Sequence, residues 1–168
     1  DVLRLFSKII AGFVEREQLV RSLQRANEEL ASLAMLDALT GLPNRRCVTE
    51  ELNRVIAHCS RTREWVLVGF IDLDDFKQIN DQFGHEAGDS LMRILAEQLS
   101  EALRGSDMLA RFGGDEFVMV GIGPQLEEDG DAALQDLQTR LSSASIASVE
   151  LSDGRKIDYA GASVGMVC

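Results

Sequence analysis

The chain has 168 residues, of which 45% are hydrophobic, and it carries 28 acidic against 17 basic side chains. This length and apolar content suffice for one sizeable core. The formal net charge of −11 argues against nucleic acid held in a basic groove and against contact with an anionic membrane surface. A polyanionic substrate would therefore have to arrive with metal ions.

Two further absences point to the cytoplasm. No apolar run approaches the roughly 18 residues that a membrane-spanning helix needs, and the N-terminus lacks the pattern of a signal peptide. The cysteines, Cys47, Cys59 and Cys168, are few, odd in number and without metal-ligand spacing, which favours reduced thiols. We expect a cytoplasmic protein with no membrane contact by this chain.

Residues 1–36 predict a long helix that pairs with a second copy. Apolar residues recur at alternating steps of four and three, which is a heptad pattern, with Arg16 and Asn27 as polar positions in the seam. A single amphipathic helix packed on its own domain is the alternative. Residues 2–14 also resemble the exit helix of a GAF-type sensor, so we expect an upstream sensor domain that is missing from this chain. The seam comprises Val2, Phe6, Ile9, Phe13, Arg16, Val20, Leu23, Asn27, Leu30 and Ala34.

The remainder predicts an α/β fold in the α+β sandwich sense, with helices flanking a central sheet. Apolar residues at helical spacing indicate helices at 45–59, after Phe76, at 87–103 and at 132–144. Strand-like runs occupy 65–71, 108–112, 117–122 and 157–167, the last with small residues on one face. We expect a single globular domain over 37–168.

An acidic cluster follows the first of these strands. Residues 65–71 form a continuous apolar run typical of a strand buried on both faces, and Asp72, Asp74 and Asp75 come directly after it. Carboxylates there are costly unless a cation uses them, and Mg²⁺ prefers one or two carboxylates with phosphate oxygens and water. A polar strand end with a helix N-cap is the alternative interpretation.

A second acidic site lies in a predicted hairpin turn. Gly113 and Gly114 permit unusual backbone angles, and the adjacent Asp115 and Glu116 follow between two strand-like runs. By itself the turn would be read as a solvated hairpin. Together with the upstream acids, it indicates a two-metal site for nucleotidyl transfer.

With both segments in hand, the chain closely resembles the GGDEF family, the diguanylate cyclases, from Asp37 to the C-terminus. The resemblance implies a mostly antiparallel sheet of the palm or nucleotide-cyclase type and the condensation of two GTP molecules into cyclic di-GMP. Four ordered motifs carry it, namely Asp37-Ala-Leu-Thr-Gly-Leu-Pro-Asn-Arg-Arg46, Phe70-Ile-Asp-Leu-Asp-Asp-Phe-Lys-Gln-Ile-Asn-Asp81, Phe83-Gly-His-Glu-Ala-Gly-Asp89 and Arg111-Phe-Gly-Gly-Asp-Glu-Phe117.

The resemblance assigns the chemistry to the two acidic segments. It implies that Asp72, the Leu73 carbonyl and Asp115 hold two Mg²⁺ ions, with Mn²⁺ as a possible substitute. Glu116 would activate the ribose 3′-hydroxyl, directly or through metal or water. Arg111 would stabilise charge in the transition state, and a surface arginine paired with the acidic neighbourhood is its alternative.

Substrate contacts are implied in the same way. Asn80 and Asp89 match the positions that bind the guanine edge, where aspartate accepts from N1–H and the 2-amino group. His85 matches a position near the nucleotide and is otherwise structural. The remaining predicted contacts, for the phosphates and for close backbone approach, are Asp75, Phe76, Lys77, Gly113 and Gly114.

Upstream of the hairpin, Arg104 and Asp107 match the family's product-inhibition site. Arginine binds phosphate bidentately and stacks on guanine, and aspartate accepts from a guanine edge. Without the family they would be read as the end of a helix and a turn. We expect cyclic di-GMP to bind here as an inhibitor.

Because each domain would hold one GTP, catalysis implies a homodimer, which the N-terminal helix would promote. Relatives continue beyond the Ser163 strand with a helix and a last strand, so we expect these two elements to be missing from 37–168. That expectation keeps two other classes open, a receptor for cyclic di-GMP without turnover and a fragment for dimerisation and signal relay. An adenylyl-cyclase-like or polymerase-palm activity would share the metals, but Asn80 and Asp89 favour guanine.

Overall fold

A computed structural model describes residues 13, 16–18, 20–22, 35–127, 130–151 and 154–168. The chain divides into two units, Asp1–Met35 and Leu36–Cys168. In the first unit the described residues between 13 and 22 are helical, as the heptad pattern predicts. Most of the predicted coiled coil lies outside the described residues, so its pairing stays a prediction.

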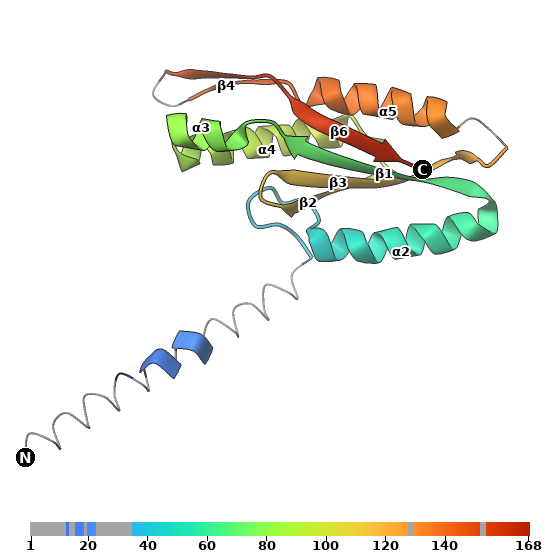
Figure 1. Cartoon of the computed structure of the whole chain (residues 1–168), viewed down its shortest axis with the longest axis horizontal. Helices are drawn as coiled ribbons and strands as arrows, with labels where there is room; N and C mark the ends of the chain where they lie inside the picture. The colour runs from blue at the N-terminus through green and yellow to red at the C-terminus, as the bar shows by residue number, and fades with distance from the viewer. Residues whose placement is uncertain (1–12, 14–15, 19, 23–34, 128–129, 152–153) are drawn as a thin grey trace, which may run out of the picture. The chain divides into compact units, whose positions relative to one another are not determined.

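The second unit is built on a four-stranded antiparallel sheet in the order β2-β3-β1-β6 (Figure 1). The apolar run after Arg63 forms the central strand, and the two halves of the predicted hairpin lie on one side of it. A separate two-stranded hairpin pairs β4 with β5. The strands are β1 (Glu64–Leu73), β2 (Met108–Gly113), β3 (Glu116–Gln125), β4 (Ala147–Glu150), β5 (Lys156–Tyr159) and β6 (Ala162–Val167).

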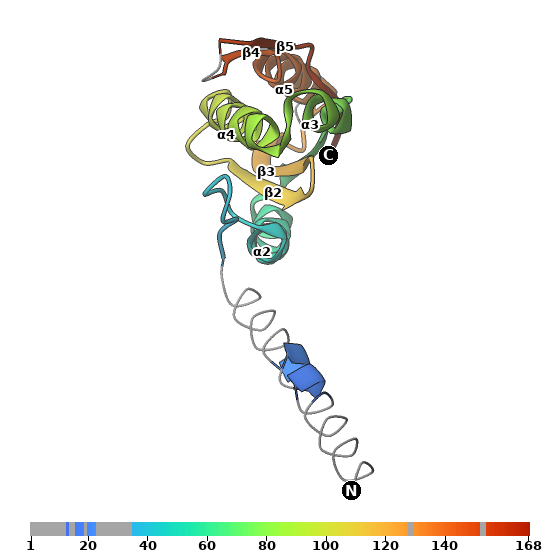
Figure 2. The ribbon, with the colours of Figure 1, turned by 90° about the vertical axis from the view of Figure 1, so that its left-hand side faces the viewer.

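Helices cover both faces of this sheet, which makes the predicted sandwich (Figure 2). One helix packs on one face, and the others lie on the opposite side with the β4–β5 hairpin. They are α2 (Arg45–Thr62) on the first face and α3 (Phe76–Phe83), α4 (His85–Glu101) and α5 (Gly130–Ala144) on the second.

Helix α2 begins and ends with recognisable signals. The Asn44 side chain accepts a hydrogen bond from the Cys47 backbone N–H, which satisfies one of the free donors at the helix start. At the other end Arg63 adopts a left-handed conformation, with φ 59°, that closes the last turn. The apolar face of α2, from Val48 to Cys59, packs on the sheet beside the buried Val118.

The larger core lies on the other face. Helix α4 contributes side chains that are fully buried, and these pack against Ile71 of β1 and Phe117 of β3. Since a Leu side chain buried in this way contributes about 1.5–3 kcal/mol, this core holds α4 and the ends of β1 and β3 in fixed positions. The fully buried α4 residues are Leu91, Met92, Leu95 and Leu99.

Two strand predictions differ from the structure. The single strand expected at 157–167 is wrong, because Gly161, at φ +129°, breaks it into β5 and β6, which belong to different sheets. Strand β4, which has only four residues, was not predicted, although its burial alternates as in a half-buried strand. The other predicted elements are present, with ends shifted by a few residues.

Within the described residues, no helix combines the length and apolar character that crossing a membrane requires.

Candidate active site

The acidic end of β1 lies beside the turn between β2 and β3. Asp72 is directly opposite Glu116 in the antiparallel register, and the Leu73 backbone N–H donates to the Asp115 carbonyl over 3.1 Å. Two like charges directly opposite each other destabilise a sheet. The Asp72 and Glu116 side chains are both exposed, so a cation can reach them from solvent.

The two glycines of the hairpin contribute differently. Gly114 adopts φ +52°, a region that residues with a Cβ rarely occupy, whereas Gly113 does not have a positive φ. A register shift separates Arg111 from Gly113 in the pairing with β3. A Cβ added at either glycine would meet nothing within 4 Å, so the space over this turn is open to a ligand.

Arg111 is engaged with two neighbours. Its Nη1 lies 3.1 Å from Asp37 Oδ1, and its Nε and Nη2 donate to the Gly114 carbonyl over 3.0 and 2.7 Å. The Arg111 side chain is only 16% exposed, and that of Asp37 is 23% exposed. The guanidinium therefore joins the hairpin to the start of the second unit, and we call this contact the Asp37–Arg111 clamp.

Asp37 is the hydrogen-bond acceptor of a compact turn that precedes α2. The Thr40 backbone N–H and hydroxyl both donate to its Oδ1, and the Arg111 backbone N–H donates to the Pro43 carbonyl over 2.9 Å. Burial raises the pKa of the Asp37 carboxyl, but the hydrogen bonds from Thr40 and then from Arg111 outweigh it, so the net pKa is lowered. The hydrogen bonds of this turn therefore favour the charged form of the Asp37 carboxyl.

A cavity of about 410 Å³ opens between this turn, α3, α4 and the hairpin. It brings together predicted residues from three separate motifs, among them Asn80, Asp89 and Asp115. Leu39 and Asp81 also line it and were not predicted. Leu39 belongs to the first motif, whose apolar position gave no signal of its own. The lining residues are Leu39, Phe76, Lys77, Asn80, Asp81, His85, Asp89, Arg111, Gly114 and Asp115.

The position of Asn80 depends on a glycine of the neighbouring helix. A Cβ at Gly88 would lie 2.1 Å from Asn80 Oδ1 and 3.4 Å from the Phe76 ring. Gly88 is buried, and its missing side chain lets α4 lie close to α3. Asn80 and Asp89 are therefore held on adjacent helices at one cavity wall.

A second hollow, of about 320 Å³, lies on the other side of the strand end. Asp72 and Glu116 line it together with Phe70 and Ser163. Asp115 lines the first cavity instead, so the predicted metal ligands Asp72 and Asp115 line different hollows. Across the part of the chain that the structure describes, no three His, Cys, Asp or Glu side chains gather closely enough to form a metal site by themselves.

The turn that leaves β1 contains a second unusual backbone position. Asp75 adopts φ +56° immediately before α3, and its Oδ1 accepts from the Gln78 side chain over 2.6 Å. The backbone N–H groups of Asp75 and Phe76 stand at the helix start, where anions are favoured. Four carboxylates lie at or near this turn. Burial raises the pKa of the Tyr159 phenol, and the negative charges of Asp74, Asp115, Asp72 and Asp75 raise it further.

Arg104 and Asp107 lie together in a third cavity, of about 190 Å³. The Asp107 carboxylate accepts from the Arg104 backbone N–H over 3.1 Å, and a Cβ at Gly121 would lie 2.7 Å from its Oδ1. Arg140 of α5 lines the same cavity, and its Nη1 donates to the Ala102 carbonyl. Sequence reasoning missed Arg140, because a single arginine beside the apolar stripe of a helix is ordinarily a surface residue.

Comparisons with known proteins find one family that matches most of the chain. The family described as "Diguanylate cyclase, GGDEF domain" matches residues 34–168. Diguanylate cyclase DgcP of Escherichia coli is 36% identical over 167 residues, which cover 99% of this chain and 47% of that protein. The chain therefore spans less than half the length of this curated relative.

Solved structures share the fold. A sensory box/GGDEF family protein of Caulobacter crescentus superposes with a TM-score of 0.73 at 38% identity, over 80% of this chain and 83% of that one. The GGDEF domain of DgcB from the same species, solved in complex with c-di-GMP, superposes with a TM-score of 0.66 at 26% identity, over 79% and 76% of the two chains.

Proposed function

Since the chain belongs to the GGDEF family of diguanylate cyclases, we propose that it condenses two GTP molecules into cyclic di-GMP and two pyrophosphates in the bacterial cytoplasm. The observation that carries the proposal is the cavity in which Asn80 and Asp89 lie opposite the acidic hairpin. Its volume of about 410 Å³ falls within the usual range for small-molecule sites, about 300–1,000 Å³.

Guanine would occupy the α3–α4 wall of the cavity. The Asp89 carboxylate accepts hydrogen bonds from the N1–H and 2-amino groups of guanine, and the Asn80 amide bonds to O6 or N3. Adenine would leave both side chains unpaired, which selects against ATP. Leu39 supplies an apolar contact for the base, and His85 borders the same space.

The triphosphate would lie along the turn that leaves β1. The N–H groups of Asp75 and Phe76 donate to phosphate oxygens at the start of α3, and the exposed Lys77 adds a positive charge. The open space over Gly113 and Gly114 admits the substrate next to the hairpin. These contacts fix the α-phosphorus beside the acidic side chains.

The acidic residues fit Mg²⁺. Asp72, Asp115 and the Leu73 carbonyl would hold two ions, and Mg²⁺ prefers such sparse oxygen ligands when phosphate and water complete its shell. A site without three gathered protein ligands in the described residues agrees with ions that arrive on the triphosphate. Bound there, they would neutralise phosphate charge and polarise the reacting oxygens.

Glu116 would accept the proton of the ribose 3′-hydroxyl as its oxygen attacks the α-phosphorus of a second GTP. A phosphorus–oxygen bond forms, and the bond to pyrophosphate breaks. Since each domain holds one nucleotide, two domains must face each other, and residues 1–36 would raise their effective concentration as a coiled coil. Arg111 would act through the hairpin, because its guanidinium is committed to Asp37 and Gly114.

The test is to incubate the protein with GTP and Mg²⁺ and to resolve the nucleotides by chromatography. We expect cyclic di-GMP from the parent and none from Glu116→Gln. A folded dimer that binds GTP without forming product would contradict turnover by this chain. That result would favour the second candidate, a receptor for cyclic di-GMP.

The receptor candidate rests on the third cavity, where Arg104, Asp107 and Arg140 converge. Two guanidinium groups and a carboxylate suit a ligand with phosphates and guanine edges. In an active enzyme the same cavity would bind the product as an inhibitor. Arg104→Ala should then relieve product inhibition in turnover assays, and unchanged inhibition would exclude this role.

A further inference from the structure

The turn from Leu73 to Phe76 adopts a conformation that its residues do not favour by themselves. Asp75 lies at φ +56° and ψ 20°, in the left-handed region that residues with a Cβ rarely occupy. Such a conformation persists only when the surrounding structure holds it in place. The residues that hold this turn therefore contribute to the site even when they do not touch substrate.

Two side chains from a distant part of the sequence converge on the residue before Asp75. The Tyr159 hydroxyl donates to the Asp74 backbone carbonyl over 2.9 Å, and the Ser163 hydroxyl donates to the Asp74 carboxylate Oδ1 over 2.8 Å. Tyr159 is the last residue of β5, and Ser163 lies in β6. The break at Gly161 lets adjacent parts of one chain segment reach the turn from two strands.

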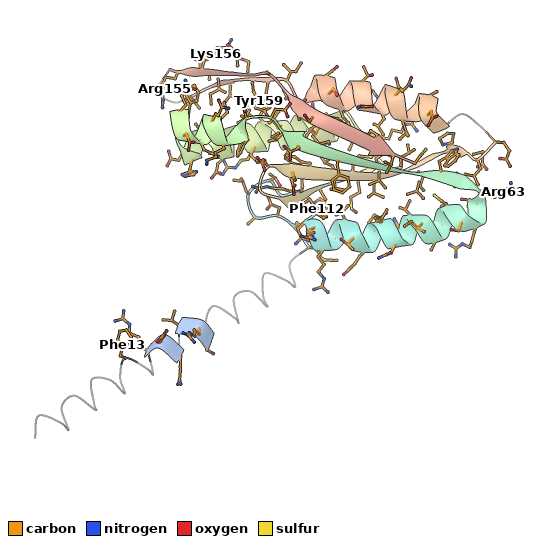
Figure 3. All side chains as sticks on the ribbon, in the orientation of Figure 1. Phe13, Arg63, Phe112, Arg155, Lys156 and Tyr159 are labelled. Atoms are coloured by element: carbon orange, nitrogen blue, oxygen red, sulfur yellow. The ribbon has the colours of Figure 1, made fainter. Side chains whose placement is uncertain are left out.

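Tyr159, labelled in Figure 3, is a buried anchor for this contact. It is 4% exposed and belongs to the large core, together with Val149 and Ile157 of the same hairpin. Burial raises the pKa of its phenol, so the hydroxyl keeps its proton and remains a donor.

The tip of the hairpin is tied to the same region. The Arg155 guanidinium lies 5.4 Å from the centre of the Phe83 ring, at the C-terminal end of α3. The β4–β5 hairpin therefore contacts α3 at its end as well as the turn that precedes it.

The peptide group between Asp74 and Asp75 explains why the hydroxyl matters. In a planar trans peptide the carbonyl and the following N–H point in opposite directions. A hydrogen bond that fixes the Asp74 carbonyl on the Tyr159 side therefore fixes the Asp75 N–H on the other side. Rotation of this peptide would replace the N–H by a carbonyl oxygen, which repels phosphate.

We propose that Tyr159 and Ser163 are positioning residues that hold the Asp74–Phe76 turn with its N–H groups directed toward the phosphates of the nucleotide. This role rests on the proposed function, because the phosphates are those of GTP. The anchoring of the turn is a property of the protein without ligand, and it is measurable by itself.

The experiment is amide hydrogen exchange on the nucleotide-free protein with Tyr159→Phe, which removes the hydroxyl and keeps the ring. We expect exchange of the Gln78 backbone amide, which donates to the Asp75 carbonyl over 2.8 Å, to rise about tenfold, while the amides of α4 keep their parent rates. Affinity for a non-hydrolysable GTP analogue with Mg²⁺ should fall about fivefold, as for the loss of one hydrogen bond. Unchanged exchange at Gln78 would overturn the proposal.

This design distinguishes a failure of nucleotide binding by the parent from a failure of Tyr159 to anchor the turn. If the parent binds no GTP analogue, the proposed function fails, and the exchange result still decides whether Tyr159 anchors the turn. If the parent binds the analogue and Tyr159→Phe binds it equally well, the positioning role is excluded.

Ser148→Ala is the matched control, since it removes a hydroxyl contact to Asp158 on the exposed side of the same hairpin. It should leave exchange at Gln78 and the affinity for the analogue unchanged. Asp75→Gly supplies an independent check, because glycine adopts φ +56° without the cost of a Cβ. In that background the effect of Tyr159→Phe on analogue affinity should shrink to about twofold or less. An equal effect in both backgrounds would show that the anchor does not act on the turn.

Discussion

The two ends of β2 hold acidic side chains in opposite ways. Before the strand begins, the Asp107 carboxylate already accepts the Arg104 N–H and packs against Gly121. Beyond its last residue, Glu116 faces Asp72 across the sheet as a like charge. The first arrangement is complete without a ligand, whereas the second needs a cation to become favourable. A comparison of the two ends thus separates the proposed inhibitor-binding surface, which is preformed, from the proposed reactive site, which is incomplete by itself.

The largest expected effect comes from neutralising one acid at the reactive end. Asp72→Asn removes the repulsion with Glu116, so the melting temperature without metal should rise slightly. Under the proposed function, cyclase activity should nevertheless fall about a hundredfold or more, because Asp72 is a proposed ligand of the metal on the reacting phosphate. Calorimetry and product chromatography measure the two effects. A drop in both stability and activity would mean that Asp72 is structural.

Glycines make room for a polar side chain beside two cavities, at Gly88 for Asn80 and at Gly121 for Asp107, and this permits a paired test. Gly88→Ala should displace Asn80, since the added Cβ would lie 2.1 Å from Oδ1, and the KM for GTP should rise about tenfold through the loss of guanine contacts. Product inhibition should stay unchanged. Gly105→Ala is the control, because nothing lies within 4 Å of a Cβ at that position.

Gly121→Ala is the counterpart beside the other cavity. A Cβ there would lie 2.7 Å from Asp107 Oδ1, so we expect about threefold weaker product inhibition, with the KM for GTP unaffected. The effect should be smaller than at Gly88, because a carboxylate at the tip of its side chain can rotate away. If Gly88→Ala and Gly121→Ala both changed the KM for GTP, or both changed product inhibition, the two cavities would not be separate sites.

The smallest effect concerns the Asp37–Arg111 clamp and its dependence on pH. The folded pKa of Asp37 lies below its ordinary value of 3.8, so the charged carboxylate stabilises the fold fully above that value. This contribution disappears as the pH falls through the folded pKa. Asp37→Asn should therefore lower the melting temperature by a few degrees at pH 7 and by less near pH 3. An equal difference at both pH values would assign the loss to packing.

The sequence predicted those parts of the site that are carried by local chemistry. The acids after β1 and the Gly-Gly-Asp-Glu turn were recognisable because carboxylates at a strand end and adjacent glycines are unusual wherever they occur. Asn80 and Asp89 followed from the family motifs. Their convergence in one cavity agrees with those assignments, while their roles in GTP binding remain proposals.

Contacts between distant residues left no comparable signal. Tyr159 and Asp74 are separated by 85 positions, and Arg111 and Asp37 by 74. Each contact depends on how the folded sheet brings two distant segments together. None of the four residues indicates, from its type and position in the sequence, which residue it contacts. The break at Gly161 was hidden for a related reason, since alternation of side chains continues across it and only the backbone angle separates the strands.

The Asp37–Arg111 clamp also has a mechanical consequence. The turn at Asp37 is the first part of the second unit, and Arg111 joins it to the Gly114 carbonyl through a single, largely buried guanidinium. Tension applied to the chain near Leu36 would reach the Gly114 carbonyl through two contacts in series, from Asp37 to the Arg111 guanidinium and from the guanidinium to the carbonyl. The turn and the hairpin are thus mechanically coupled through the Arg111 side chain.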